Sequence, residues 1–393
     1  MGIDRSFDHT NWMTPPFNRQ AFQHMREFVP TAHIERSADP VALPRRPLPL
    51  DDVAVRSRRG GTITWAEHLA TTWCDAVCVV HDGHVVDERY FEGMHERRLH
   101  LLMSVSKSVC GAALGVAIGR GEIDADQLVT DVAPEFAGTS LDGATVRHVI
   151  DMTAGTDFVE DYDDYDEADP EVPLIEYEHH ASYRPLGART PIGTLGHFRT
   201  YGTAFPHGDR FQYRSPLTNV AARLLEVVND LPYADIVTRD LWGPLGTEHD
   251  ANLMLDPLRH PVVEGGMSCT LRDLARLGLA YLDDGVVGGR RVIPAEWVAD
   301  TRHGDDQALA AFEAQPGGNV DGWSMYRNAF WVLERDQVFS GLGIFGQYCW
   351  IHRPSRTVIA RFSTTPTALP EDVSAETLGA FTTIAEHLAD RHG

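Results

Sequence analysis

Stretches with the composition of β-strands occur near both ends of this sequence, with a long helical pattern between them. Residues 76–80 and 84–91 are rich in valine and flank the turn His81-Asp82-Gly83, and two such runs around Asp-Gly predict a β-hairpin. Residues 328–333, 346–351 and 357–362 have the same character and precede a helix over about 374–390. The order predicts an α+β fold in which both chain ends build one antiparallel sheet flanked by helices.

The sequence divides into three predicted parts. Residues 1–60 are rich in proline and arginine and predict an irregular N-terminal arm with a short helix near 18–28. Residues 61–150 and 255–393 together are expected to form the α/β domain that contains the sheet. Residues 151–254 are expected to form a mostly helical inserted subdomain, because periodic apolar positions at 216–247 follow a helical spacing.

The charge and composition of the chain limit the kinds of partner that it can bind. A formal charge of −23 and a pI near 5.1 argue against nucleic acid or an anionic membrane as a partner. We find neither an apolar run long enough to span a membrane nor a secretory signal, and therefore expect a cytoplasmic protein. Five cysteines at irregular spacings predict buried, reduced thiols. No motif demands a metal or cofactor, and we expect neither. The expected partner is a small-molecule substrate, and a homodimer is possible.

The sequence contains a single lysine, Lys107. Arginine stays protonated near neutral pH, whereas a lysine can lose its proton when burial lowers its pKa. A sole lysine is therefore better explained by proton transfer than by surface charge, although an arginine-biased composition could leave one lysine by chance. Ser104 precedes it by three residues, which puts both side chains on one face of a helix. Ser-x-x-Lys is the nucleophile and base spacing of penicillin-recognising serine hydrolases.

The segment from Ser104 to Gly119 predicts the helix that would carry this pair. Its apolar and small residues recur at helical spacing and leave almost no polar face. Ser104 would stand at the helix N-terminus, near the positive end of the macrodipole. A lysine in such a buried helix is desolvated, which favours the neutral amine.

An acidic segment runs from Asp157 to Glu171, with nine carboxylates and three interleaved aromatic residues, Phe158, Tyr162 and Tyr165. The simpler interpretation is a solvated surface loop. The alternative is a loop that faces the substrate, in which case its charge would attract a cationic substrate.

Three segments in this order resemble the motifs of serine hydrolases with the class C β-lactamase and penicillin-binding fold. They are Ser104-Val105-Ser106-Lys107, then Tyr213-Arg214-Ser215, then Gly341-Leu342-Gly343 at the place of a Lys-Thr-Gly triplet. Within that superfamily the chain looks most like the 6-aminohexanoate-dimer hydrolases (nylon-oligomer hydrolases) and related family VIII-type esterases, through residues 15–19, 101–108, 160–162 and 343–347. The resemblance covers nearly the whole chain and implies a β-lactamase/transpeptidase-like fold.

The resemblance also implies roles for individual residues. Ser104 would be the acylated nucleophile, Lys107 its base, and Tyr213 a member of the same proton network that helps to protonate the leaving group. The backbone N–H groups of Ser104 and Ile344, the latter following Gly343, would form the oxyanion hole. On the substrate side, the resemblance implies Ser215 of the Tyr-x-Ser element, Tyr162, and Glu264, which stands where relatives carry histidine or asparagine.

Two departures from the family pattern narrow the expected substrate. Gly341-Leu342-Gly343 lacks the lysine that grips the carboxylate of a β-lactam, which argues against β-lactamase and DD-peptidase activity. Amide-cleaving relatives hold the substrate amine with an aspartate in a loop that here reads as residues 176–183, where no aspartate aligns. These departures favour an ester over a linear amide. An acyltransferase on the same fold, and a binder or sensor that is merely acylated, remain the alternatives.

Overall fold

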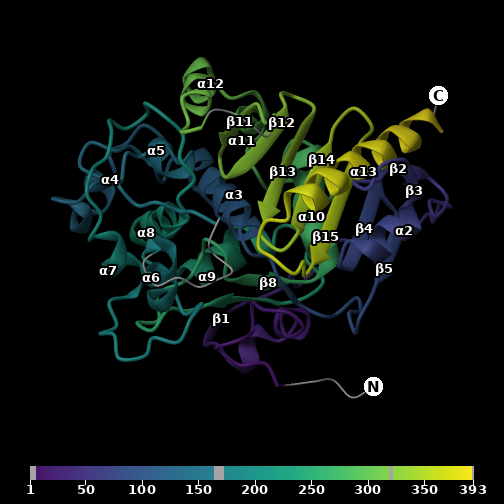
Figure 1. Ribbon diagram of the computed structural model, residues 1–393. Coiled ribbons are helices and arrows are strands. Elements are labelled where there is room, and N and C mark those ends of the chain that lie inside the picture. The colour runs from purple at the N-terminus through teal and green to yellow at the C-terminus, as the bar shows by residue number, and fades with distance from the viewer. Residues whose placement is uncertain (1–5, 163–171, 318–321, 392–393) are drawn as a thin grey trace.

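A seven-stranded antiparallel sheet forms the centre of the protein, with strand order β11-β12-β13-β14-β15-β4-β5 (Figure 1). The computed structural model describes residues 6–162, 172–317 and 322–391. The strands are β4 (Cys74–His81), β5 (His84–Tyr90), β11 (Met325–Arg327), β12 (Phe330–Glu334), β13 (Val338–Gly343), β14 (Gln347–His352) and β15 (Thr357–Ser363). The predicted hairpin is present as β4 and β5, with Val79 opposite Asp87.

The two ends of the chain meet where β4 pairs with β15, for example at Val79 and Ile359. Every residue of both strands is buried, because helices cover the sheet on both faces. Strands buried on both faces read as continuous apolar runs rather than as an alternating pattern, and 76–80 is such a run. The predicted α+β fold with a sheet built from both chain ends is confirmed.

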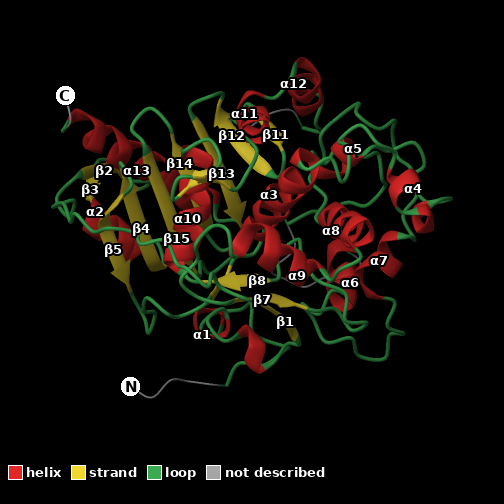
Figure 2. Cartoon of the chain, turned by 180° about the vertical axis from the view of Figure 1, so that it is seen from behind, coloured by secondary structure: helices red, strands yellow, loops and turns green. Residues whose placement is uncertain are grey.

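Two helices from opposite chain ends cover one face of the sheet, and two central helices cover the other. Helices α2 (Trp65–Thr71) and α13 (Glu371–Asp390) pack Leu69 and Phe381 onto the first face. Helices α3 (Val105–Gly119) and α10 (Leu271–Leu282) lie on the second face. Figures 1 and 2 show this layering from the two sides. Ser104 at the start of α3 is therefore held against the sheet.

A group of helices surrounds α3 on the side away from the sheet. The helices are α4 (Val129–Val132), η2 (Pro134–Phe136), α5 (Val146–Ile150), α6 (Pro173–His180), α7 (Gly193–Phe198), α8 (Pro216–Asn229), α9 (Tyr233–Val237) and η4 (Thr238–Trp242). Helix α8 has its apolar side buried, from Leu217 to Leu225. The region beyond α10 adds β9 (Val286–Val287), β10 (Arg290–Arg291), α11 (Ala295–His303) and α12 (Asp306–Glu313). The predicted three-part division of the chain stays a prediction.

The N-terminal segment contains more regular structure than the irregular arm that we expected. Two short helical turns, α1 (Asn18–Ala21) and η1 (Met25–Glu27), take the place of the helix expected near 18–28. β1 (Thr31–Ile34) joins the four-stranded sheet β1-β7-β8-β6, whose other strands are β7 (Ala251–Met254), β8 (Met267–Cys269) and β6 (His100–Leu101). β2 (Ala54–Arg56) pairs with β3 (Thr62–Thr64). Strands of this length are too short to give a detectable periodicity.

The helices and the cysteines bear on two further expectations from the sequence. Within the described residues, no helix is both long and apolar enough to cross a membrane. All five cysteines are buried and free, and burial raises the pKa of the Cys74 thiol to about 12. These thiols therefore stay protonated near neutral pH, in line with the expected reduced state.

Candidate active site

Ser104 lies at the N-terminal end of α3, directly after the short strand β6. Met103 adopts a left-handed backbone conformation with φ 45°, which is costly for a residue with a side chain and turns the chain sharply before the serine. The Ser104 side chain makes no capping hydrogen bond to the helix. Its hydroxyl is therefore free for another partner, and the residue is partly exposed at the pocket.

The ammonium group of Lys107 is that partner. Its Nζ lies 2.8 Å from Ser104 Oγ and donates a second hydrogen bond to the Glu264 backbone carbonyl at 2.6 Å. Lys107 is only 1% exposed. Burial lowers its pKa to about 8, while the carboxylates of Glu160 and Glu264 work in the opposite direction. The structure thus brings together the pair that the sequence predicted, and places the amine where it can exchange a proton with the serine.

The hydroxyl of Tyr213 completes a three-residue cluster. It hydrogen-bonds with the side chains of Ser104 and Ser215. Removal of this hydroxyl from solvent, reinforced by the charge of Glu160, raises the Tyr213 pKa well above its ordinary value. Its ring lies 5.0 Å from Lys107 Nζ and stacks on Trp331 with ring centroids 5.5 Å apart. Tyr213 is therefore a neutral phenol near neutral pH, able to pass a proton but not to act as a strong base.

The end of β13 passes close to the start of α3. A Cβ atom on Gly343 would lie 2.6 Å from the Leu102 carbonyl oxygen, and one on Gly341 would lie 2.7 Å from Ser108 Oγ. Only glycine permits this approach, which is a structural reason for the Gly341-Leu342-Gly343 triplet. Ile344 follows at the pocket. Among the described residues, the backbone N–H groups of Ser104 and Ile344 donate to no acceptor.

Glu160 holds Ser215 and Tyr162 in place, a role that neither the acidic segment nor the family match at residues 160–162 had indicated. Its carboxylate accepts hydrogen bonds from the Ser215 hydroxyl at 2.7 Å and the Tyr162 hydroxyl at 2.6 Å, and also from the Ser215 backbone N–H. Because the acidic segment contains nine carboxylates, the sequence alone did not distinguish Glu160 from the other eight. Residues 163–171 of the acidic segment lie outside the described residues, so the expectation for that part of the loop stays a prediction.

The Glu264 side chain is buried in the same pocket. Its Oε1 accepts a hydrogen bond from the Tyr177 hydroxyl at 2.7 Å, and Asn219 Nδ2 donates to that hydroxyl at 2.7 Å. Its Oε2 has no hydrogen-bond partner within the described part of the chain. Burial raises the Glu264 pKa to about 7, against the opposing effect of the Tyr177 hydrogen bond. Tyr177 and Asn219 are site residues that the sequence did not reveal, because they lie on separate helices.

The segment expected to be a loop at 176–183 is mostly helix. Residues up to His180 belong to α6, and a turn follows. Glu178 at this position lines the pocket but accepts a hydrogen bond from Arg184 Nε at 2.6 Å. The helix begins at Pro173, where the fixed φ of proline suits the first helical turn.

These groups border one small pocket of about 30 Å³. All the predicted site residues except Tyr213 and Gly343 line this pocket. Residues that the sequence did not indicate complete the lining. The lining consists of Met103, Ser104, Lys107, Tyr162, Leu174, Tyr177, Glu178, Tyr183, Ser215, Glu264, Gly265 and Ile344. Within the described residues, no cluster of side chains is arranged to hold a metal ion.

The family model for β-lactamases matches residues 66–383. The chain belongs to the β-lactamase family. It is 35% identical over 359 residues to the 6-aminohexanoate-dimer hydrolase of Paenarthrobacter ureafaciens, which covers 91% of this chain and 88% of that protein. This membership, together with the resemblance to that relative, identifies the protein as a serine hydrolase of the β-lactamase fold and confirms the family resemblance read from the sequence.

Solved structures show the same fold. A Bacillus anthracis protein assigned as a 6-aminohexanoate-dimer hydrolase superposes with a TM-score of 0.88 at 24% identity, over 99% of each chain. EstCE1, a hydrolase with promiscuous acyltransferase activity, superposes with a TM-score of 0.61 at 16% identity, over 81% of this chain and 96% of that one. At these identities the likeness concerns the fold alone, and the predicted β-lactamase/transpeptidase-like architecture is confirmed.

Proposed function

We propose that this protein cleaves a small ester, or a linear amide of the 6-aminohexanoate-oligomer type, through an acyl-enzyme on Ser104. The observation that carries the proposal is the contact of 2.8 Å between Ser104 Oγ and the buried amine of Lys107. A buried lysine with a pKa of about 8 is neutral in roughly a tenth of the molecules at pH 7. That fraction is enough to supply a base without prior deprotonation by another group.

Acylation follows from this geometry. Neutral Lys107 keeps one N–H on the Glu264 carbonyl and turns its lone pair to the Ser104 hydroxyl. As Lys107 takes that proton, Ser104 Oγ bonds to the substrate carbonyl carbon and the carbonyl oxygen becomes an oxyanion. The two N–H groups of Ser104 and Ile344, which have no acceptor of their own among the described residues, would receive it. Donors of this kind contribute about 3 kcal/mol each.

Release of the alcohol or amine needs a proton. The Tyr213 hydroxyl bonds to Ser104 and stays protonated near neutral pH. It can therefore donate to the leaving group while Lys107 replenishes its proton. The C–O or C–N bond breaks, and a water molecule that gives its proton back to the base then hydrolyses the ester of Ser104. Without protonation, an alkoxide leaves far more readily than an amide anion, so an ester requires less of this proton transfer.

A serine-directed fluorophosphonate probe tests the nucleophile. We expect a single adduct, mapped to Ser104 by peptide mass spectrometry, and none in Ser104→Ala. A panel of p-nitrophenyl esters and the 6-aminohexanoate dimer then compares ester with amide turnover. Labelling at Ser106 or Ser108, or unchanged labelling of Ser104→Ala, would show that the nucleophile is assigned wrongly.

The lifetime of the acyl-enzyme separates this proposal from the two alternatives. A hydrolase releases the acyl group in water alone, and an acyltransferase releases it much faster when an alcohol or amine acceptor is added. An acylated binder or sensor releases it in neither case. Mass spectrometry of the intact protein over time, with and without an acceptor alcohol, distinguishes the three.

β-Lactams should be poor substrates. The Gly341-Leu342-Gly343 triplet offers no cation for their carboxylate. The nearby guanidinium of Arg214 is engaged by the Phe158 carbonyl at 2.7 Å and by Gln212. Nitrocefin hydrolysis should therefore remain close to the uncatalysed rate, and efficient turnover would show that another cation serves the carboxylate.

A further inference from the structure

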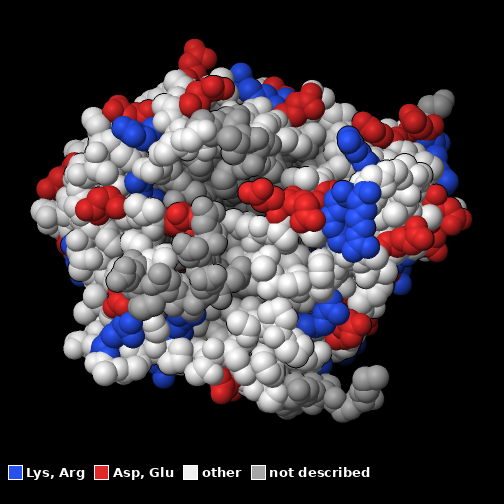
Figure 3. Space-filling view, in the orientation of Figure 1, with Lys and Arg blue, Asp and Glu red and all other residues white. Residues whose placement is uncertain are grey.

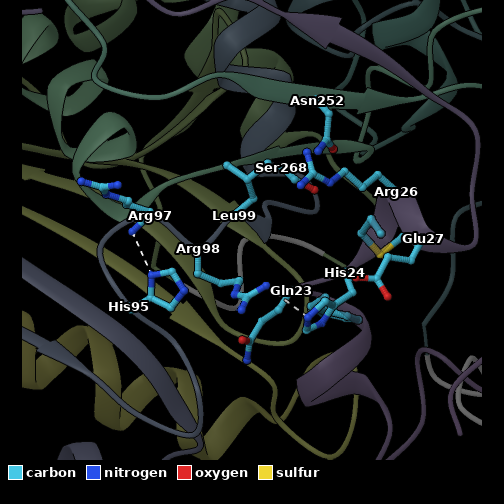
Figure 4. Close-up of a pocket in the computed structure, with 12 residues that line it drawn as sticks. Gln23, His24, Arg26, Glu27, His95, Arg97, Arg98, Leu99, Asn252 and Ser268 are labelled. Atoms are coloured by element: carbon cyan, nitrogen blue, oxygen red, sulfur yellow. Dashed lines mark hydrogen bonds between the residues drawn. The ribbon is translucent and has the colours of Figure 1, made fainter. Parts of the chain in front are cut away.

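A second cavity, of about 270 Å³, lies between the N-terminal segment, residues 95–99 and the four-stranded sheet. It shares no residue with the pocket of Ser104 and Lys107. Figure 4 shows its side chains converging from these three directions, with Arg26 from η1 reaching towards Asn252 and Ser268. Nothing in the proposed reaction uses this cavity.

Its floor carries buried polar atoms with no partner. Ser268 on β8 is 2% exposed and Asn252 on β7 is 7% exposed. Neither Ser268 Oγ nor Asn252 Oδ1 has a hydrogen-bond partner in the described chain, and the same is true of Arg98 Nε. Such groups cost free energy when they are left unsatisfied, so the two donors among them, the Ser268 hydroxyl and the Arg98 Nε–H, indicate a ligand with acceptor atoms. Asn252 Oδ1 is an acceptor and needs a donor from water or from another part of the ligand.

The charge of the cavity favours an anion. Three arginines line it, Arg26, Arg97 and Arg98, and none of them has a carboxylate partner within the described residues. Glu27 is the one carboxylate in the described lining. The chain as a whole carries a formal charge of −23, and in the space-filling view acidic side chains lie beside many of its arginines (Figure 3). A cluster of arginines without a carboxylate partner in the described chain is thus unusual for this protein.

Neighbouring contacts hold the donors in place. His24 Nδ1 lies 2.7 Å from the Gln20 carbonyl, so it carries the proton, and His24 Nε2 accepts from Arg98 Nη1 at 3.2 Å. This contact fixes the guanidinium of Arg98, whose Nε–H has no partner within the described chain. The Ser268 hydroxyl and the Asn252 amide can also donate. Guanidinium groups match the paired oxygens of a carboxylate or phosphate in a two-point geometry.

We propose that this cavity is a binding site for a small molecule that carries a carboxylate or phosphate group, separate from the hydrolytic site. The anionic group would be held by Arg26, Arg98 and the Ser268 hydroxyl, and the rest of the cavity has room for a short organic chain. The site is independent of the proposed reaction at Ser104. Its floor is nevertheless connected to helix α3, because Ser268 follows Met267, whose backbone N–H donates to Ser106 Oγ at 3.1 Å.

Calorimetric titration of the full chain with inorganic phosphate and with hexanoate, at constant ionic strength, tests the proposal. We expect one saturable site for at least one of the two anions, and which anion binds identifies the source. Hexanol, the neutral control, should not bind. Protein labelled at Ser104 with a fluorophosphonate should bind the anion as well as unlabelled protein does. Loss of binding on labelling would place the anion in the hydrolytic pocket and overturn the proposal.

Variants locate the site. Arg26→Gln removes an exposed guanidinium, so the fold should tolerate it, and we expect affinity to fall about tenfold. Arg26→Gln combined with Arg98→Gln should abolish measurable binding. Arg59→Gln, which removes the same charge from an exposed position elsewhere, is the matched control and should bind like the unaltered protein.

A second readout excludes an effect on folding. The ring resonances of His24 should shift on addition of the anion in the unaltered protein, and not in the double variant. An affinity equal in the double variant and the control, or an absence of any saturable binding and of any His24 shift, would mean that the cavity holds only water.

Discussion

The Glu160 carboxylate accepts hydrogen bonds from both the hydroxyl and the backbone N–H of Ser215, the former at 2.7 Å. Ser215 in turn hydrogen-bonds with Tyr213, which also hydrogen-bonds with Ser104. Glu160 is therefore linked to Ser104 through two intervening side chains. Charge-assisted hydrogen bonds of this kind are stronger and more directional than neutral ones. In the proposed reaction, Glu160 would therefore position the Tyr-x-Ser element.

Glu160→Gln should lower kcat/KM for an ester substrate. A neutral amide offers one acceptor oxygen where the carboxylate offers two, so one of the contacts to Ser215 or Tyr162 is lost. The loss of a hydrogen bond to a charged group costs about 1.5–3 kcal/mol, which corresponds to about tenfold or more in rate. Asp161→Asn, at the exposed neighbouring position, is the control and should retain full activity. Equal activities of the two variants would exclude the positioning role of Glu160.

The pH dependence should follow Lys107. If its neutral amine is the base, kcat/KM rises with pH through the lysine pKa of about 8. The Glu264 carboxylate raises the pKa of Lys107, since a negative charge favours the ammonium. Glu264→Gln removes that charge, so the pKa of Lys107 falls and the rising limb should move to lower pH. Stopped-flow acylation rates between pH 5 and pH 10 measure the limb, and a shift to higher pH would contradict the assignment.

Lys107→Arg should be nearly as inactive as Lys107→Ala. Arginine keeps the positive charge and much of the length, but it does not release its proton near neutral pH. A general base contributes about 10² to 10⁴ in rate, and both variants should lose that factor in single-turnover acylation. Retention of more than roughly a tenth of the activity by Lys107→Arg would show that the lysine acts through its charge rather than as a base.

Two glycine-to-alanine substitutions should have opposite effects on stability. In Gly343→Ala the new methyl group would lie 2.6 Å from the Leu102 carbonyl oxygen, so β13 must move away from the start of α3. Overpacking of this kind costs about 1–3 kcal/mol of folding free energy. The same movement should displace the backbone N–H of Ile344, so the acylation rate should also fall.

Gly379→Ala is the matched control, because no atom lies within 4 Å of its new methyl group and the site is inside α13. Alanine in a helix interior is favoured over glycine by about 0.5–1 kcal/mol. Urea unfolding measures both variants, and acylation should be unchanged in Gly379→Ala. A Gly343→Ala variant as stable and active as the unaltered chain would mean that β13 adapts without cost.

Local patterns in the sequence determined the helix from Ser104, the hairpin around Asp82-Gly83 and the Ser104–Lys107 pair, because each depends on residues a few positions apart. The order of the strand-rich runs also determined the sheet that joins both chain ends. The short strands β1 and β2 escaped this reasoning, since three or four residues show no periodicity.

Only the tertiary structure decided which distant side chains meet. Glu160 is one of nine carboxylates in the acidic segment, and its contacts with Ser215 and Tyr162 distinguish it. Tyr177 reaches Glu264 because α6 packs beside the pocket, and Arg26 comes to face Ser268 because η1 lies against β7 and β8. Such contacts depend on how elements far apart in the chain pack together. They cannot be predicted from the spacing or composition of a single sequence, because these patterns depend only on residues close together in the chain.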